Sequence, residues 1–304
     1  MKRVGVVGAR GYVGGELLPI LFRHGGVEVA WVTSSTAAGQ PVQGSSLVFQ
    51  KADPAILGEQ PVDAVILALP NGEAAAWAKA AGDAVVVDLS ADHRFDDAWA
   101  YGQPERFRER IRGSKRIAAP GCYATAAQLA IAPLLDVLSG PAHVFGVSGY
   151  SGAGTTKSEK NDPEVLRDNV LPYSLVGHTH EKELRRHLGG ARVYFTPHVA
   201  AFFRGLVVTV STELARPLAQ AELEERFAKA YGHEAFVTIT KEPPRPRDTV
   251  GSHGVRVGGL SLGDEGRHAV VVAALDNLLG GAASHAVRSL NLALGLDERT
   301  GVSP

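Results

Sequence analysis

Cys122 is the residue of this sequence best suited to covalent chemistry, and it is the only cysteine. It follows the turn-forming pair Pro120-Gly121 and precedes a long apolar segment that predicts a helix over 124–138. Amide groups at a helix N-terminus stabilise a thiolate, so this position lowers the pKa of a thiol. A thiolate attacks acyl carbons and aldehydes. We therefore predict that Cys122 is a nucleophile; the competing interpretation is a small buried core residue.

A glycine-rich segment near the beginning of the sequence predicts a phosphate-binding turn. It reads G-x-x-G-x-x-G and lies between an apolar run at 3–8 and a helical pattern at 13–24. Glycines allow a tight turn and let backbone N–H groups approach a pyrophosphate at the helix N-terminus. A turn that serves only the packing of the helix on the strand is the alternative. The residues expected around the phosphates are Gly8, Arg10, Gly11, Tyr12, Val13 and Gly14.

The residues after the second predicted strand favour NADP(H) over NAD as the cofactor. In dinucleotide-binding domains an acidic residue ~20 positions beyond the glycines binds the ribose 2′-OH of NAD. Here the strand at 27–33 is followed by Ser34 and Ser35, and no acidic residue follows Glu28 in this region. Hydroxyl groups can donate to a 2′-phosphate, and Arg10 is close enough in sequence to pair with it.

A thiolate beside a nicotinamide would split a difficult acyl reduction into two easier steps.

The elements that must position these residues are those of an α/β protein. Apolar segments at 63–69 and 84–89 predict buried strands on either side of a helix at 73–81. Such alternation indicates a parallel sheet that is covered on both faces. We therefore predict a Rossmann-type doubly wound parallel sheet plus an α+β catalytic domain with a mixed or antiparallel sheet. The strands expected in the second sheet are 143–148, 192–196, 205–213, 235–240 and 268–275.

We place the domain boundary at the cysteine. Residues 1–121, together with a C-terminal helix at about 277–304, are predicted to form an NADP-binding Rossmann domain. Residues 122–276 are predicted to form the catalytic, substrate-binding and oligomerisation domain. The active site is expected in the cleft between the domains, where such sites tend to occur.

Composition excludes several classes of protein. The 304 residues are 45% hydrophobic and 21% charged, with a net charge of −1, so no basic field attracts nucleic acid or an anionic membrane. No apolar run approaches the ~18–20 residues that span a bilayer. A single cysteine precludes an intrachain disulfide and fits a reducing compartment. We expect a cytoplasmic protein without nucleic-acid or membrane partners, whose basic segment at 105–116 is a solvated helix face.

Taken together, the motifs resemble those of the N-acetyl-gamma-glutamyl-phosphate reductases, relatives of the aspartate-semialdehyde dehydrogenases. The resemblance implies NADPH-dependent reduction of an N-acetylglutamyl γ-phosphate to the semialdehyde, through a thioester on Cys122, in arginine biosynthesis. It implies a small acyl-phosphate substrate, released phosphate, and a homodimer or homotetramer. The segments that carry it occur in the family's order and cover nearly the whole chain: 8–17, 88–94, 120–125, 148–154, 177–183, 203–205 and 276–278.

The resemblance also assigns roles to individual residues. His178 is expected to be the acid/base residue, with His180 as the competing candidate. Asn277 is expected to contact the cofactor. Backbone amides of the turn after Ser151 suit an acyl phosphate, and arginine suits a phosphate or a carboxylate. The expected substrate contacts are Arg94, Ser151, Gly152, His180 and Arg204.

Alternative interpretations remain open at several of these positions. A His178-Thr179-His180 strand would present two imidazoles on one face, as in a zinc site, but the H-E-x-x-H pattern fails at Leu184, and we predict no metal. Arg94 could instead pair with Asp92 without touching substrate. For function, the alternatives are a reductase of aspartyl or aminoadipyl phosphate, and a non-catalytic NADP-binding redox regulator. The family often has Lys at the position of Gly280, so a lysine role there is in doubt.

Overall fold

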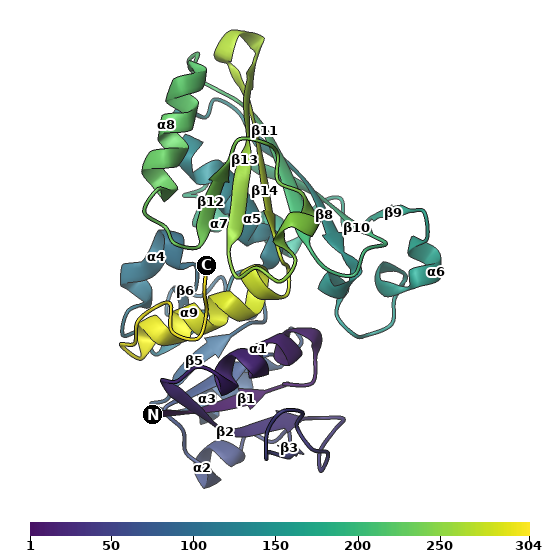
Figure 1. The fold of residues 1–304 in the computed structure, drawn as a ribbon, viewed down its shortest axis with the longest axis vertical. Helices are drawn as coiled ribbons and strands as arrows, with labels where there is room; N and C mark the ends of the chain where they lie inside the picture. Colours follow the sequence, from purple (N-terminus) through teal and green to yellow (C-terminus); the bar gives the residue numbers. More distant parts are fainter. The chain divides into compact units, whose positions relative to one another are not determined.

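The structure, a computed structural model, describes residues 1–304 and divides into two compact units. Unit 1 comprises residues 1–120 and 282–303, and unit 2 comprises residues 121–281 with Pro304. The chain therefore leaves unit 1 once, forms the whole of unit 2, and returns to unit 1 with its last helix (Figure 1). No helix combines the length and the hydropathy needed to cross a bilayer.

A seven-stranded sheet forms the centre of unit 1, and every pair of neighbouring strands in it is parallel. The strand order is β3-β2-β1-β4-β5-β7-β6, so it reverses direction between β1 and β4, the switch point at which sheets of this kind bind ligands. The strands are β1 (Lys2–Val7), β2 (Val27–Ser34), β3 (Phe49–Lys51), β4 (Ala64–Leu67), β5 (Val85–Asp88), β6 (Ala100–Tyr101) and β7 (Arg116–Ala118).

Helices cover the sheet of unit 1, and β4 and β5 are buried along their whole length. Helix α1 continues through Pro19, because the burial of residues such as Leu17 and Leu21 against the sheet outweighs the loss of one backbone hydrogen bond. The helices of this unit are α1 (Tyr12–Phe22), α2 (Ile56–Glu59), α3 (Ala74–Ala80), α4 (Pro104–Ile111) and α9 (Ser284–Ala293).

Unit 2 contains a seven-stranded mixed sheet in the order β12-β13-β14-β11-β8-β10-β9. The pairs β8–β10 and β12–β13 are parallel and the other pairs are antiparallel. The two sheets confirm the predicted fold class. The strands are β8 (Ala142–Gly149), β9 (Val170–Pro172), β10 (Val193–Ala200), β11 (Leu206–Glu213), β12 (Val237–Thr240), β13 (Val255–Gly263) and β14 (His268–Leu275).

One face of the mixed sheet carries the hydrophobic core of unit 2. Helices α5, α7 and α8 pack on this face, and their apolar side chains join those of the strands in one cluster (Figure 1). The opposite face is uncovered and exposes Phe145 on β8 and Tyr194 on β10. The helices of unit 2 are α5 (Cys122–Ile131), α6 (Pro163–Leu166), α7 (Thr179–His187) and α8 (Gln220–Tyr231).

Two predicted helices differ from the structure. The helix expected over 124–138 ends at Ile131 and continues as a 3-10 helix, Ala132–Val137, which has a proline in its first turn. The C-terminal segment begins with a π-helical turn, Leu279–Ala283, before α9. Strand β13 was not predicted, because its glycines and a register shift after Gly258 break the alternation of apolar residues.

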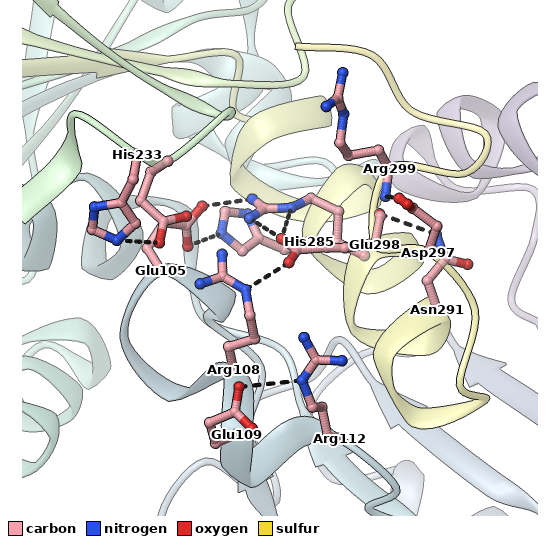
Figure 2. A network of polar contacts seen from close by, with 12 residues as sticks. Glu105, Arg108, Glu109, Arg112, His233, His285, Asn291, Asp297, Glu298 and Arg299 are labelled. Atoms are coloured by element: carbon pink, nitrogen blue, oxygen red, sulfur yellow. Dashed lines mark hydrogen bonds and ion pairs between the residues drawn. The ribbon is translucent and has the colours of Figure 1, made fainter.

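The expectation that residues 105–116 form a solvated face is wrong for part of α4. The side chain of Glu105 has no exposed surface and pairs with Arg288 of α9, with 2.5 Å between Oε1 and Nη1. His285 Nε2 lies 3.3 Å from the second oxygen of Glu105. Glu298 lies 2.6 Å from Arg288 Nη2 and 2.7 Å from Arg108 Nε. We call these five side chains the ionic network (Figure 2).

Charge compensation keeps the two carboxylates of the ionic network ionised despite their burial. Burial alone would raise the pKa of Glu105, but the charges of Arg288 and His285 and their hydrogen bonds hold the pKa of that carboxyl far below its ordinary range. Burial also disfavours the ionised form of Glu298. The hydrogen bonds and charges of Arg108 and Arg288 outweigh this effect, so the pKa of that carboxyl is lowered as well. The network therefore joins α4 to the C-terminal segment, about 180 residues away in sequence.

Candidate active site

Cys122 is the first residue of α5, and its side chain is half-buried. Gly121 is the N-cap, with φ −73° and ψ 147°, and its carbonyl accepts a hydrogen bond from Thr125 N at 2.8 Å. The next residue, Tyr123, donates its hydroxyl to the carbonyl of His198 at 2.6 Å. The thiol therefore stands at the positive end of a well-anchored helix, an arrangement that favours a thiolate.

Gly281 allows the π-helical turn to approach Cys122 closely. A Cβ atom at Gly281 would lie 2.7 Å from Cys122 Cβ and 2.9 Å from a methyl carbon of Leu275, so a larger residue would push the cysteine away. A Cβ atom at Gly280 would lie 2.7 Å from the carbonyl oxygen of Gly254, which excludes a lysine in this backbone conformation. Single π-turns are frequent at functional sites.

His178 and His180 lie at the beginning of α7, not on a strand as the zinc interpretation requires. His178 is the N-cap, and its Nδ1 accepts a hydrogen bond from His180 N at 3.0 Å. Because Nδ1 is the acceptor, the neutral ring carries its proton on Nε2. The two imidazole centroids are 4.8 Å apart. No group of three or more His, Cys, Asp or Glu side chains is arranged to hold a metal ion.

Opposing charges act on the His178 imidazole. Burial lowers its pKa most, and the positive charge of Lys160 lowers it further. The carboxylates of Glu183 and Glu181, both on α7, raise it, but the net direction is downward. His178 is therefore neutral at neutral pH, which is the form that a proton acceptor needs.

Two tyrosines complete the surroundings of the cysteine, and sequence reasoning missed both. Burial raises the pKa of Tyr123 and of Tyr173, and the negative charge of a Cys122 thiolate nearby raises both further. The Tyr173 ring lies between Lys160, whose Nζ is 5.0 Å from its centroid, and His178, whose ring centroid is 5.6 Å away. Neither tyrosine lies in a sequence pattern that distinguishes it from a core aromatic residue.

The predicted acyl-phosphate pocket is a buried hydrogen-bonded corner of unit 2. Ser151 lies in the 3-10 helix Tyr150–Ala153, and its hydroxyl accepts a hydrogen bond from Asn277 Nδ2 at 2.9 Å. Asn277 Oδ1 accepts a hydrogen bond from Gly205 N at 2.7 Å. The structure therefore brings Ser151, Gly152 and Asn277 together. Both the nitrogen and the oxygen of the Asn277 side-chain amide form hydrogen bonds within the protein.

The two predicted anion-binding arginines have different surroundings. Arg204, in unit 2, lies with Nε 2.8 Å from the buried carboxylate of Asp276. Arg94, in unit 1, donates from Nε to the carbonyl of Ala119 at 2.9 Å and from Nη2 to that of Leu89 at 3.0 Å. Arg94 thus clamps the loops that follow β5 and β7, and the second of these loops leads directly to Cys122 in the chain.

The glycine-rich turn of unit 1 has the geometry of a backbone cradle. Gly8 has φ +74°, and a Cβ atom there would lie 2.3 Å from the carbonyl oxygen of Ala68. A Cβ atom at Gly14 would lie 2.4 Å from the carbonyl oxygen of Ala9, whereas one at Gly11 would meet only the carbonyl oxygen of Gly8, at 3.8 Å. The turn therefore packs tightly at its first and third glycines and leaves Gly11, Tyr12 and Val13 at least partly exposed at the N-terminus of α1, a position that suits an anion.

The end of β2 brings together part of the predicted 2′-phosphate site. Arg10 Nη1 lies 3.3 Å from the hydroxyl of Thr36, and Ser35 is exposed beside it in sequence. Ser34 is buried, and its hydroxyl accepts hydrogen bonds from Thr36 N and Ala37 N, so it shapes the turn. The arrangement offers a guanidinium and two hydroxyls to a phosphate group.

Comparison with known proteins places both units in one family. The model "Semialdehyde dehydrogenase, NAD binding domain" matches residues 3–114, and "Semialdehyde dehydrogenase, dimerisation domain" matches residues 122–277. A curated protein from Stenotrophomonas maltophilia, named N-acetyl-gamma-glutamyl-phosphate reductase, is 50% identical over 98% of this chain and 97% of its own length. One of the same name from Xylella fastidiosa is 46% identical over 98% of this chain and 94% of its own.

Solved structures with a similar fold are more distant in sequence. Aspartate semialdehyde dehydrogenase II from Vibrio cholerae matches with a TM-score of 0.81 at 19% identity, over 97% of this chain and 98% of its own. The aspartate semialdehyde dehydrogenase from Candida albicans, solved with NADP, matches with a TM-score of 0.76 at 17% identity, over 96% and 98%. These likenesses establish the shared fold of the two units.

Proposed function

Because the chain belongs to the semialdehyde dehydrogenase family, and within it to the N-acetyl-gamma-glutamyl-phosphate reductases, we propose that it reduces N-acetyl-gamma-glutamyl phosphate to N-acetylglutamate semialdehyde, with NADPH, in arginine biosynthesis. The observation that carries the proposal is the position of Cys122. The only cysteine of the chain begins α5 and interacts electrostatically with Tyr173, whose ring contacts the histidine pair through His178.

The residues of unit 2 support a thioester route. The Cys122 thiolate attacks the acyl carbon, the bond from that carbon to the phosphate oxygen breaks, and phosphate leaves. Ser151 and the backbone amides of its turn stabilise the oxyanion that forms during the attack. Neutral His178 accepts the thiol proton and later donates it to the alkoxide of the Cys122 thiohemiacetal. When the carbon–sulfur bond of that adduct breaks, the proton leaves the oxygen through the imidazole and returns to the sulfur, and the aldehyde is released. His180 is the competing candidate for this task.

The residues present in unit 1 fit NADP(H). A Cβ atom at Gly8 or Gly14 would clash with the carbonyl oxygen of Ala68 or Ala9, so only glycine allows this turn, whose backbone amides suit a pyrophosphate. Arg10, with Ser35 and Thr36, suits the 2′-phosphate. When it is bound, the cofactor supplies the hydride that reduces the thioester carbon. Asn277 supports the site through Ser151, while Arg94 and Arg204 remain proposed contacts for the substrate anions.

A phosphate-dependent NADP+ reduction assay tests this function. N-acetylglutamate semialdehyde and aspartate semialdehyde are offered in parallel, with and without inorganic phosphate. We expect NADPH formation only with phosphate, and a much higher kcat/KM for the N-acetylated substrate. A preference for aspartate semialdehyde would favour the alternative acyl phosphate, and cofactor binding without turnover would favour a redox regulator.

We also propose a homo-oligomer, a homodimer or homotetramer, in the cytoplasm, where a catalytic thiol stays reduced. Support for self-association comes from the uncovered face of the mixed sheet in unit 2. Phe145 and Tyr194 expose nearly half of their surface there, and His143 and Thr196 lie on the same face. Such a broad, partly apolar face suits a second copy of the sheet. Sedimentation equilibrium measures the assembly directly, and a monomer at micromolar concentration contradicts the proposal.

A further inference from the structure

Glu183 is a buried ionisable side chain that the proposed reaction does not use. Its exposed fraction is 0%, and a buried carboxylate is costly unless hydrogen bonds compensate. Its Oε1 accepts a hydrogen bond from Gly121 N at 2.9 Å. Gly121 immediately precedes Cys122, so this contact ties helix α7 to the turn that carries the nucleophile.

The same helix carries the acid/base histidine. His178 is the N-cap of α7, and Glu183 lies on the second turn of that helix. The negative charge of Glu183 favours the protonated imidazole, in opposition to burial and to Lys160. Glu183 therefore contacts the turn before the nucleophile and acts electrostatically on its proton partner.

Three contacts fix the position of Cys122, and the one that Glu183 makes connects it to α7. After the cysteine, the Tyr123 hydroxyl binds the His198 carbonyl at the end of β10. Behind it, Gly281 brings the π-helical turn against the cysteine Cβ. Before it, the hydrogen bond from Gly121 N to Glu183 fixes the turn to the helix of the histidines.

We propose that Glu183 is a positioning residue, which sets the geometry between the Cys122 thiolate and the His178 imidazole by joining α7 to the nucleophile turn. The inference rests on the proposed function for the identity of the two reacting groups. A displacement of about 1 Å between such groups lowers a rate by about 100-fold.

Two conservative variants separate the reach of this side chain from its charge. Glu183→Asp keeps the charge but withdraws the acceptor from Gly121 N by one methylene. Glu183→Gln keeps an oxygen acceptor at the same distance but removes the charge. Glu181→Gln is the matched control, because Glu181 is also buried on α7 but accepts a hydrogen bond from Phe195 N at 3.1 Å on β10.

Two readouts are measured on each full-length variant, scaled to the folded fraction from thermal unfolding. The first is kcat/KM with N-acetylglutamate semialdehyde, NADP+ and phosphate. The second is the rate of Cys122 alkylation by iodoacetamide at a pH where the thiol is fully ionised, which reports thiolate placement without catalysis. The single cysteine makes this label specific.

We expect Glu183→Asp to lower kcat/KM by about 100-fold and to change the alkylation rate, because the turn moves. On the pH-independent plateau, where His178 is neutral, we expect Glu183→Gln to retain at least about a tenth of the activity with an alkylation rate near that of the wild type. Under the same conditions Glu181→Gln should change neither quantity, because its effect on the pKa of His178 appears only on the acid limb. The proposal is overturned if the Asp variant is as active as the wild type, or if the Gln variant is impaired more than the Asp variant. A wild type without turnover would refute the proposed function, whereas the alkylation series would still decide the position of the turn.

Discussion

The ionic network of unit 1 and the surroundings of Cys122 in unit 2 contain similar residue types, but the charged groups in them are compensated differently. In the network, Glu105 and Arg288 have no exposed side-chain surface, and each is compensated by a partner of opposite sign. Near Cys122, His178 is half-buried; burial and the charge of Lys160 lower its pKa, whereas the charges of Glu183 and Glu181 raise it. The network holds its two carboxylates in the ionised form, whereas the opposing influences on His178 leave its imidazole able to change protonation state.

This contrast shows that burial of ionisable groups does not by itself mark an active site. A group whose partners all favour one charge state contributes to stability, and it resists the proton transfers that catalysis needs. A group between opposing influences can gain and lose a proton near neutral pH. Substitutions in the ionic network should therefore change mainly the stability of the protein, whereas substitutions near Cys122 should change mainly the reaction rate.

Cys122→Ser tests the contrast with the largest expected effect. A serine hydroxyl is not ionised at neutral pH, so we expect kcat/KM to fall by about 10³-fold or more, as when a nucleophile is removed from other enzymes. Thermal stability and NADPH affinity should stay close to those of the wild type, as measured by unfolding curves and fluorescence titration. Normal turnover of this variant would remove the thioester mechanism.

Arg288→Met should have the opposite profile. It removes the guanidinium that pairs with the buried Glu105 carboxylate and leaves His285 as the remaining network partner of that carboxylate. Breaking a buried pair in this way costs about 3–5 kcal/mol of unfolding free energy. The kcat of the remaining folded enzyme should be nearly unchanged. Urea unfolding measures the loss, and the double variant with Glu105→Gln should recover part of it. An unfolding free energy of Arg288→Met equal to that of the wild type would mean that the ionic network does not stabilise the packing of α4 against α9.

Gly281→Ala should have an intermediate effect, because the added methyl group meets Cys122 Cβ at 2.7 Å. Overpacking of this kind costs about 1–3 kcal/mol, and displacement of the thiol should lower kcat by about tenfold. Gly58→Ala is the control, since a Cβ atom there has no neighbour within 4 Å. Unfolding curves and initial rates are compared for both; equal activity of the two variants would contradict the close approach.

The smallest expected effects are shifts of the acid limb of kcat/KM against pH. Activity falls on this limb as neutral His178 becomes protonated. Lys160→Met removes a charge that lowers the pKa of His178, so the limb should move to higher pH. Glu183→Gln removes a charge that raises that pKa, so the limb should move to lower pH. Shifts in the same direction for both variants would contradict His178 as the titrating residue.

The sequence predicted the parts of the fold that repeat a local pattern. The apolar segments that became β4 and β5 are continuous and bounded by turns, so their burial in a parallel sheet follows from hydropathy alone. Strands of two or three residues, such as β6 and β7, carry no periodicity and are defined by their neighbours in the sheet. β13 was missed because tertiary packing of Gly258 against Thr240, and not alternation, fixes its path.

The candidate site was predictable where a residue acts through its immediate neighbours in sequence. Cys122 could be inferred because the turn and the helix that surround it are adjacent in the chain. Glu183 and Tyr173 could not, because their importance depends on contacts with residues roughly 50 to 60 positions away. Arg288 was missed for the same reason, since its partner Glu105 lies 183 positions earlier.

The discontinuity of unit 1 has a consequence for how the protein is made. During synthesis the segment that contains Glu105 leaves the ribosome long before Arg288 and Glu298 do. Until the last residues emerge, the nascent dinucleotide-binding unit lacks both α9 and the guanidinium that compensates its interior carboxylate. A chain that stops before Ser284 would retain Cys122 but lack α9, so we expect its dinucleotide-binding unit to be less stable than that of the full chain.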